Sequence, residues 1–400
     1  MSTVLFQFAP GGDWISMVIW FVMLLFLFFL YPRMMVSQIM WKLDRVARDL
    51  EKMSDDSKRF IHKHISDKPD KNLRDSINRF FEFFVITPVD LDPYGIVRKF
   101  DHVLTDQRDR FRYFVNQVAP KFDPEKKASL EMGFAGGMTV HQIAKIVRHY
   151  VELVRQTKNI QIAMILQMQL PMIERIAKAM FRGTKALTKG EPIGDAVGPY
   201  ITASLIGDNK IQELEEDVIF SKIKMDNRNI FILKSKGPGG RLGRIDKVVN
   251  SLTAKNKITR VITIDAAAKL EGEKTGTVAE GVGIAMGGPG VERYNIEEAV
   301  IKKNIPLDSI VVKMSQEEAI TPMRKVIKDS LKEVKKSIGR SMERTKKGDN
   351  VIIIGVGNTS GVGNTGKTAK EMEEWVDKRE KKIKAIKKKK KKKFDIDTDI

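Results

Sequence analysis

Apolar residues follow two different patterns along this chain of 400 residues. Up to about residue 186 they recur mostly at steps of three and four, the spacing of one face of an α-helix. A representative series is Ile143, Ile146, Val147, Tyr150, Val151 and Val154. From residue 187 onward, short β-branched runs alternate with helical segments, which is typical of βαβ units. The sequence therefore predicts a helical N-terminal part and an α/β C-terminal part.

The C-terminal part, residues 187–365, contains four short apolar runs that predict buried strands. They cover residues 230–233, 261–264, 309–312 and 351–354. Helical segments separate these runs, and a strand that returns through a helix runs parallel to the strand before it. We therefore expect a three-layer α/β domain with a mostly parallel sheet.

The N-terminus contains an uncharged apolar run of seventeen residues from Trp14 to Leu30, which Tyr31 extends. This length predicts a single N-terminal transmembrane helix over residues 14–31, after an extracytoplasmic tail of residues 1–13. A cleaved signal peptide is the alternative, but no basic residue precedes the run and no small-residue cleavage site follows it. Basic residues begin only at Arg33, so the positive-inside rule predicts a cell-membrane protein with its N-terminus outside and its bulk in the cytoplasm.

Residues 34–66 are expected to form an amphipathic stalk, followed by an all-α domain over residues 70–186. The stalk carries apolar residues at heptad spacing: Val36, Ile39, Leu43, Val46, Leu50 and Met53. A parallel coiled coil, with homo-oligomers formed through residues 36–60, is one interpretation. A single amphipathic helix that packs on its own domain is the other.

Glycine concentrates in three segments of the α/β part, and backbone amides in such loops bind anions well. We therefore expect these segments to bind a small anionic ligand or a nucleotide. The residues assigned to this role are Gly237, Gly239, Gly240, Gly243, Gly281, Gly283, Gly287, Gly288, Gly290, Gly355, Gly357 and Asn358. Glycines that serve only tight turns are the alternative.

Two aspartates are candidates for catalysis. Asp265 ends the apolar run at 261–264, and Asp195 lies in a turn between glycines. Two carboxylates at neighbouring strand ends can share a proton for hydrolysis or hold a divalent metal. We therefore expect Asp195 and Asp265 to lie together at one edge of the sheet, with Asp265 as a possible metal ligand.

Residues 361–368 also match the phosphate-binding P-loop pattern through Gly361, Gly366, Lys367 and Thr368. The context is poor, because a P-loop follows its strand directly and six residues intervene here. Val261 to Asp265 could supply the strand aspartate that holds magnesium in such a site.

The net charge of +20 is concentrated toward the C-terminus, where residues 387–393 are all lysine. Residues 366–400 are therefore expected to form a basic, lysine-rich, disordered tail. Such a tail could bind anionic lipid, or could hold RNA or ribosomes as a scaffold. A solvated tail with no specific partner is the alternative. The chain contains no cysteine, which excludes disulfides and cysteine catalysis.

The segments around Asp195 and Asp265 resemble those of the hydrogenase-maturation and spore-germination peptidases. Those enzymes join a Gly-Asp-x-x-Gly loop to an aspartate in an Ile/Val-Asp-Ala strand. Here the strand that ends in Val356-Gly357-Asn358 comes last, so the resemblance implies a circularly permuted fold. The histidine ligand of those families has no counterpart, because no histidine follows His149.

Other motifs resemble an archaeal family of membrane-anchored proteins, the domain-of-unknown-function family 1512 (DUF1512). These motifs cover residues 89–97, 141–150, 237–243, 265–273 and 356–359. The resemblance implies a single-span protein that faces the cytoplasm, and it implies no activity.

The sequence thus predicts an α/β domain that binds a small anionic ligand or nucleotide. A metal-dependent or acid hydrolase that uses Asp195 and Asp265 is the first alternative, and a scaffold for RNA or ribosomes is the second. Whether the chain is an enzyme stays open, and no cofactor beyond a possible divalent metal is implied.

Overall fold

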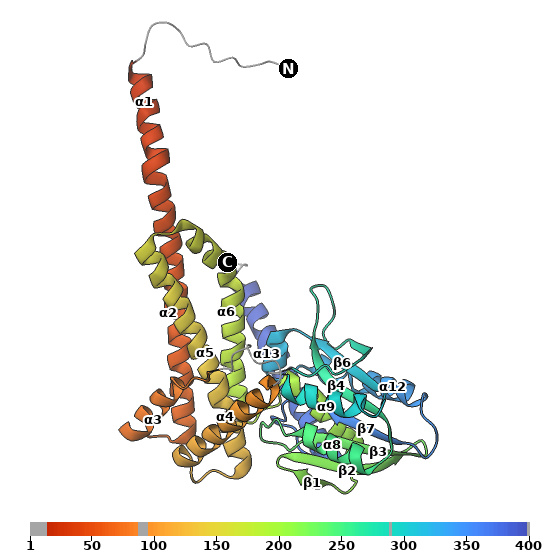
Figure 1. Ribbon diagram of the computed structural model, residues 1–400. Coiled ribbons are helices and arrows are strands. Elements are labelled where there is room, and N and C mark those ends of the chain that lie inside the picture. Colours follow the sequence, from red (N-terminus) through yellow and green to blue (C-terminus); the bar gives the residue numbers. More distant parts are fainter. Residues whose placement is uncertain (1–13, 87–94, 288–289, 398–400) are drawn as a thin grey trace, which may run out of the picture. The chain divides into compact units, whose positions relative to one another are not determined.

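The computed structural model describes residues 14–86, 95–287 and 290–397 (Figure 1). The helices are α1 (Trp14–Leu25), the π-helical turn η1 (Phe26–Leu30), α2 (Tyr31–Ile65), α3 (Lys71–Phe81), α4 (Ile96–Val118), α5 (Pro124–Thr157), α6 (Ile160–Thr188), the 3₁₀ turn η2 (Gly194–Ala196), α7 (Val197–Ile206), α8 (Ile245–Lys255), α9 (Val291–Ile301), α10 (Gln316–Ile320), α11 (Lys325–Lys328), α12 (Leu331–Met342) and α13 (Gly366–Asp397). The strands are β1 (Gln212–Glu215), β2 (Val218–Met225), β3 (Arg228–Ser235), β4 (Ile258–Ala268), β5 (Val278–Val282), β6 (Leu307–Met314) and β7 (Asn350–Gly355).

Contacts divide the described residues into two compact units. One unit comprises Met1–Lys52 with Gln142–Glu174, and the other comprises Met53–His141 with Arg175–Ile400. The second unit contains the whole sheet and every residue of the candidate site below.

The prediction of a single N-terminal transmembrane helix is wrong. Within residues 14–86, 95–287 and 290–397, the structure has no helix with both the length and the apolar character needed to cross a bilayer. The apolar run is divided, because α1 has 12 residues and ends where the π-helical turn begins. A helix of that length rises about 18 Å, against the ~30 Å of a hydrocarbon core. The predicted orientation, with the N-terminus outside and the bulk of the chain in the cytoplasm, depended on this helix.

Four of the heptad positions of α2, Ile39, Leu43, Val46 and Leu50, are buried within the first unit. Ile39, Leu43 and Leu50 are almost completely inaccessible to solvent. The Arg148 guanidinium on α5 donates to Glu51 at 2.6 Å and to Asp44 at 2.9 Å, which fixes α2 against α5. The seam is therefore covered by the same chain, as the single-helix alternative requires. Homo-oligomers through residues 36–60 stay a prediction.

The sheet of the second unit is mixed, so the prediction of a mostly parallel sheet is wrong. Its strand order is β1-β2-β3-β7-β4-β6-β5. The four predicted strands are β3, β7, β4 and β6, and they pair in parallel at its centre. The other three strands pair antiparallel at the two edges. Asp226 and Asn227, both with positive φ, make the two-residue turn that sends β3 back along β2.

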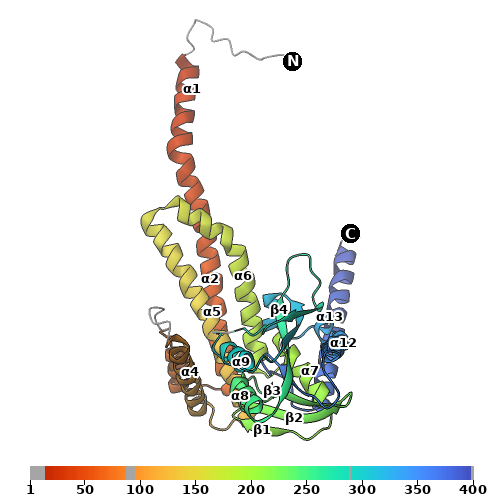
Figure 2. The same cartoon turned by 45° about the vertical axis from the view of Figure 1, so that its right-hand side comes forward.

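Helices cover both faces of this sheet, which gives three layers (Figure 2). Alternate side chains of each central strand point to opposite faces, as the period of two requires. In β7, Val351 and Ile353 pack against α7, α12 and α13, whereas Ile352 and Ile354 pack against α8 and α9. The carboxyl ends of β3, β7 and β4 consequently meet at one edge of the sheet.

Within the predicted disordered tail of residues 366–400, the described residues are helical instead, because α13 runs from Gly366 to Asp397. Ala369, Met372 and Val376, at steps of three and four, are buried in the core shared with α7 and α12. Tyr200 donates its hydroxyl hydrogen to Glu373 at 2.7 Å and so joins α7 to α13. The first turns of α13 are therefore part of the α/β layer.

Helix α7 lies unusually close to the sheet. A Cβ on Gly198 would overlap the backbone carbonyl oxygens of Ile264, within β4, and of Val356, directly after β7. A Cβ on Gly355 would overlap the carbonyl oxygen of Gly198 and the side chain of Thr202. Glycine at these positions lets the backbones touch.

The change Gly198→Ala should destabilise the protein by about 1–3 kcal/mol, because the added methyl group has no room between fixed backbone atoms. Gly339 in α12 is the matched control, since a Cβ there meets nothing within 4 Å. Gly339→Ala should stabilise the protein by about 0.5–1 kcal/mol through helix propensity. Urea unfolding of both variants measures the difference, and equal effects would contradict the close approach.

Candidate functional site

A cavity of about 480 Å³ opens at the carboxyl edge of the sheet, where Asp195 and Asp265 both line it. One wall comes from the ends of β3 and β4, from the loop after β7 and from the start of α9. The opposite wall comes from α4 and α5. An aromatic core of Phe81, Phe111 and Phe134 holds these helices together and so positions this wall.

Each aspartate is oriented by one backbone N–H. The Asn358 N–H donates to Asp195 Oδ2 at 2.8 Å, and the Ala266 N–H donates to Asp265 Oδ1 at 2.6 Å. Among the residues that the structure describes, the second oxygen of each carboxyl has no hydrogen-bond partner. Asp265 is only 4% exposed. Two carboxyls thus leave one oxygen each for a molecule in the cavity.

Both carboxyls are harder to ionise than a carboxyl in water. Burial, and then the charge of Asp195, raise the pKa of Asp265 to about 8, against the stabilising Ala266 N–H. Burial also raises the pKa of Asp195, while the Asn358 N–H favours its ionised form. Asp265 is therefore protonated at neutral pH, and an ionised Asp195 makes the loss of its proton harder.

Gly357 allows this arrangement. Its φ is +123°, a conformation that side chains disfavour, and a Cβ there would overlap the carbonyl oxygen of Asp195. The loop after β7 can therefore turn directly over Asp195 and present the N–H of Asn358 to it.

Two further carboxyls of the cavity were missed by the sequence analysis. Glu131 lies on α5, and burial raises its pKa to about 7 despite the nearby Arg112 and Arg241. Glu292 lies in the first turn of α9 and accepts from Arg108 at 2.7 Å. No sequence signal marks Glu131, because it looks like any polar residue on a helix.

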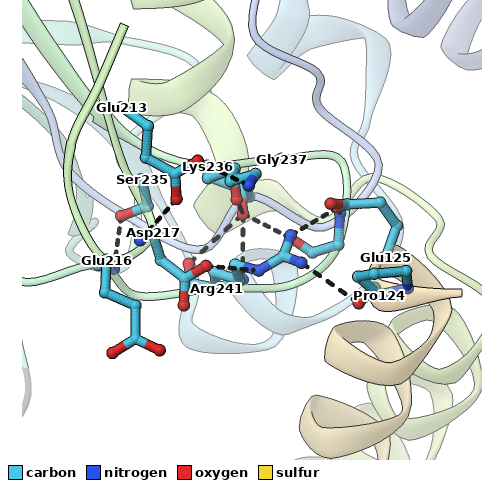
Figure 3. Close-up of polar contacts among 12 residues, drawn as sticks. Pro124, Glu125, Glu213, Glu216, Asp217, Ser235, Lys236, Gly237 and Arg241 are labelled. Carbon is cyan, nitrogen blue, oxygen red and sulfur yellow. Dashed lines mark hydrogen bonds and ion pairs between the residues drawn. The ribbon is translucent and has the colours of Figure 1, made fainter.

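The glycine-rich loop of residues 237–243 is held by the protein itself. Figure 3 shows Arg241 between Glu125, at 2.5 Å, and Asp217, at 3.0 Å. The loop N–H groups of Gly237, Gly239, Arg241 and Gly243 donate to Asn364 Oδ1, Glu125 Oε2, Thr359 Oγ1 and Ser235 Oγ respectively. These amides are occupied, so they do not form the free anion cradle that we expected.

A buried lysine supports the same loop from beneath. Lys234 is completely buried, and its Nζ donates to Ser235 O at 2.7 Å and to Asn364 Oδ1 at 2.9 Å. Burial lowers its pKa to about 7. Asn364 in turn bonds both backbone groups of Gly237, so Lys234 fixes the base of the loop.

The other predicted ligand-binding glycines are divided between the cavity and the fold. Gly243, Gly287, Gly290 and Gly357 line the cavity. Gly281 belongs to the edge strand β5, and Gly283 follows it and donates to Leu307. Gly355 serves packing, Gly240 packs against Met132 and Asn358, and Gly288 lies outside the described residues.

Part of the backbone of the P-loop-like segment is engaged by the protein itself. The N–H groups of Gly361, Thr365 and Gly366 donate to Pro238 O, Thr368 Oγ1 and Gly207 O. Lys367 is exposed on α13, and the Thr368 hydroxyl donates to Thr365 O. These three N–H groups are not free for a phosphate, and the P-loop assignment stays a prediction.

The metal interpretation of Asp265 also lacks support. Across residues 14–86, 95–287 and 290–397, His, Cys, Asp and Glu side chains form no group of three or more that could hold a metal ion. Zinc sites use at least three such ligands. The role of Asp265 as a metal ligand stays a prediction.

The raised pKa of Asp265 predicts a stability that falls as pH rises. A carboxyl has a pKa of about 4 in an unfolded chain, so the folded chain binds the extra proton between about pH 4 and about pH 8. Stability is lost across this window. Asp265→Asn removes the free-energy cost of ionising this buried carboxyl. We therefore expect the free energy of unfolding to increase by on the order of a few kcal/mol at pH 8.5, and by less toward pH 5.

Thermal unfolding of wild type and variant at several pH values measures this gain. Asp208→Asn, at an exposed turn after α7, is the control and should behave as wild type. A difference that does not grow with pH would contradict the raised pKa of Asp265.

Comparison with known families covers both parts of the chain. Residues 17–190 match the family model described as "Protein of unknown function (DUF1512) N-terminal domain", and residues 193–363 match "Domain of unknown function (DUF1512) C-terminal". No curated protein and no solved structure matches the chain, so the permuted peptidase fold stays a prediction. Asp195 and Asp265 lie in the second match and Glu131 in the first, so both contribute to one cavity. Together the matches span most of the chain, which therefore belongs to the DUF1512 family.

Proposed function

We propose that the protein is a hydrolase that cleaves the bond between a carbonyl carbon and its leaving group, as in an amide, by acid–base catalysis with Asp195 and Asp265. One observation carries the proposal. Both carboxyls are oriented by a backbone N–H, both leave one oxygen to the same cavity, and the pKa of Asp265 is raised to about 8, so that it can donate a proton at neutral pH. Enzymes that hydrolyse amides with two carboxyls need one group ionised and the other protonated.

The roles follow from the two environments. Ionised Asp195 accepts a proton from a water molecule, whose oxygen attacks the substrate carbonyl carbon. Protonated Asp265 donates its proton to the carbonyl oxygen, which gives a neutral tetrahedral intermediate. In the second step the proton on Asp195 passes to the leaving nitrogen and the carbon–nitrogen bond breaks. The carbonyl re-forms as its hydroxyl proton returns to Asp265, so both carboxyls regain their starting states.

The charge of the cavity favours this function over the binding of an anion. Glu131, Asp195, Asp265 and Glu292 line it, and Arg108 is the one basic side chain among its described lining residues. Arg108 is already paired with Glu292. A phosphate or carboxylate would therefore meet an excess of negative charge and few free donors.

Cleavage of internally quenched peptides of mixed sequence by the purified full chain tests the proposal. Asp195→Asn and Asp265→Asn should each reduce kcat/KM by about 10²–10⁴, the usual contribution of a general acid or base. The wild-type rate should fall as pH rises through about 8, because Asp265 loses the proton that it donates.

The control variant Asp208→Asn should cleave at the wild-type rate. EDTA should leave the rate unchanged, because the proposed reaction uses no metal. A metal-dependent reaction would stop. Absence of cleavage by wild type, or full activity of Asp265→Asn, would refute the assignment.

A further inference from the structure

We propose that the substrate carries a basic side chain of the lysine or arginine type, and that Glu131 is the residue that selects it. This inference rests on the proposed function, since it names the substrate of the same cavity. It adds a recognition group on the wall opposite the two aspartates.

The charges of the cavity lead to this substrate class. Arg108 and Glu292 balance each other in an ion pair at 2.7 Å. Asp265 is uncharged at neutral pH, because its pKa is raised to about 8. The remaining charges are those of ionised Asp195, which the proposed reaction uses, and of Glu131. A cationic ligand would satisfy Glu131, whereas an anionic ligand would be repelled.

Glu131 is available for such a role. Its carboxylate makes no hydrogen bond or ion pair with any residue in the described part of the chain. Two arginines approach it, but both are committed elsewhere. Arg112 binds Glu216 and, at 2.7 Å, Asp217, while Arg241 binds Asp217 and Glu125.

Asp265 gives independent evidence that the cavity is built for a polar ligand. Its side chain is more than nine-tenths buried and lines the cavity, yet its Oδ2 has no hydrogen-bond partner within the described residues. This oxygen faces the cavity, so a ligand or a water molecule there can supply the hydrogen bond that the protein does not.

The apolar part of the lining fits the stem of a basic side chain. Leu104, Phe111, Met132, Leu242 and Met286 contribute this surface. Lysine and arginine side chains pair an aliphatic stem with a charged end, so the stem can contact these residues while the charge reaches Glu131. Methionine adapts to either stem because it is flexible.

The affinity for such a group should depend on pH in a defined direction. Glu131 has a pKa of about 7, and it faces Arg112 and Arg241 together with Asp217 and Glu216. A cation binds the ionised form, so its affinity should increase as pH rises from 6 to 8. Binding should also release protons into the buffer.

Calorimetry with two small probes that contain no amide bond tests the inference. Free L-lysine supplies the stem and the charge, and free L-norleucine supplies the stem alone. Wild-type protein should bind the lysine probe about tenfold or more tightly, as expected for a charge-assisted contact. Equal affinities for the two probes would overturn the proposal.

The variant Glu131→Gln should lose this preference, whereas Glu131→Asp should retain part of it. Glu271→Gln, at an exposed position away from the cavity, is the matched control. If Glu131→Gln fails to fold, the pH series is repeated on Asp265→Asn, in which Glu131 titrates without Asp265, and decides instead. An affinity for the lysine probe that does not rise between pH 6 and 8 would refute the role of Glu131.

The outcomes separate this inference from the proposed hydrolysis. A protein that prefers the lysine probe but cleaves no peptide would refute the hydrolase and leave the basic ligand. A protein that cleaves peptides with no preference for a basic residue would refute the basic ligand and leave the hydrolase.

Discussion

The candidate site depends on one steric constraint, the contact between Gly198 and the carbonyl oxygens of Ile264 and Val356. Asp195 lies three residues before Gly198, and Asp265 directly follows Ile264. The same backbone contact therefore sets the separation of the two carboxyls. Side chains of like charge would otherwise move apart, so packing of the backbone holds them together against their repulsion.

Two other buried carboxyls of the chain, unlike this pair, form ion pairs. Asp308 binds Arg260 at 2.7 Å, and Asp246 binds Arg244, so each structural carboxyl has a cation beside it. Among the described residues, neither Asp195 nor Asp265 has such a partner. Burying these two carboxyls without a cation lowers the stability of the fold. Destabilising arrangements of this kind are concentrated at functional sites.

The central strands and the meeting of Asp195 with Asp265 could be predicted from the sequence, because parallel strands end at one edge and Asp265 ends an apolar run. The antiparallel edges were missed, although the Asp226-Asn227 turn was a usable signal. The helical wall could not be predicted. Nothing local distinguishes Glu131 from a solvated glutamate, since its burial depends on how α4 and α5 pack.

Glycine content misled the prediction of the ligand for a physical reason. Glycine permits a close approach equally to a phosphate and to another backbone, and sequence cannot tell these uses apart. Here Gly198 and Gly355 admit helix α7, and the 237–243 loop gives its amides to Glu125, Thr359 and other protein groups. The groups that still face the cavity are carboxyls, so the chemistry of the site is set by the polar groups that the protein does not use for its own hydrogen bonds. Since the helical half supplies Glu131, it belongs to the site itself and is more than a support for the α/β half.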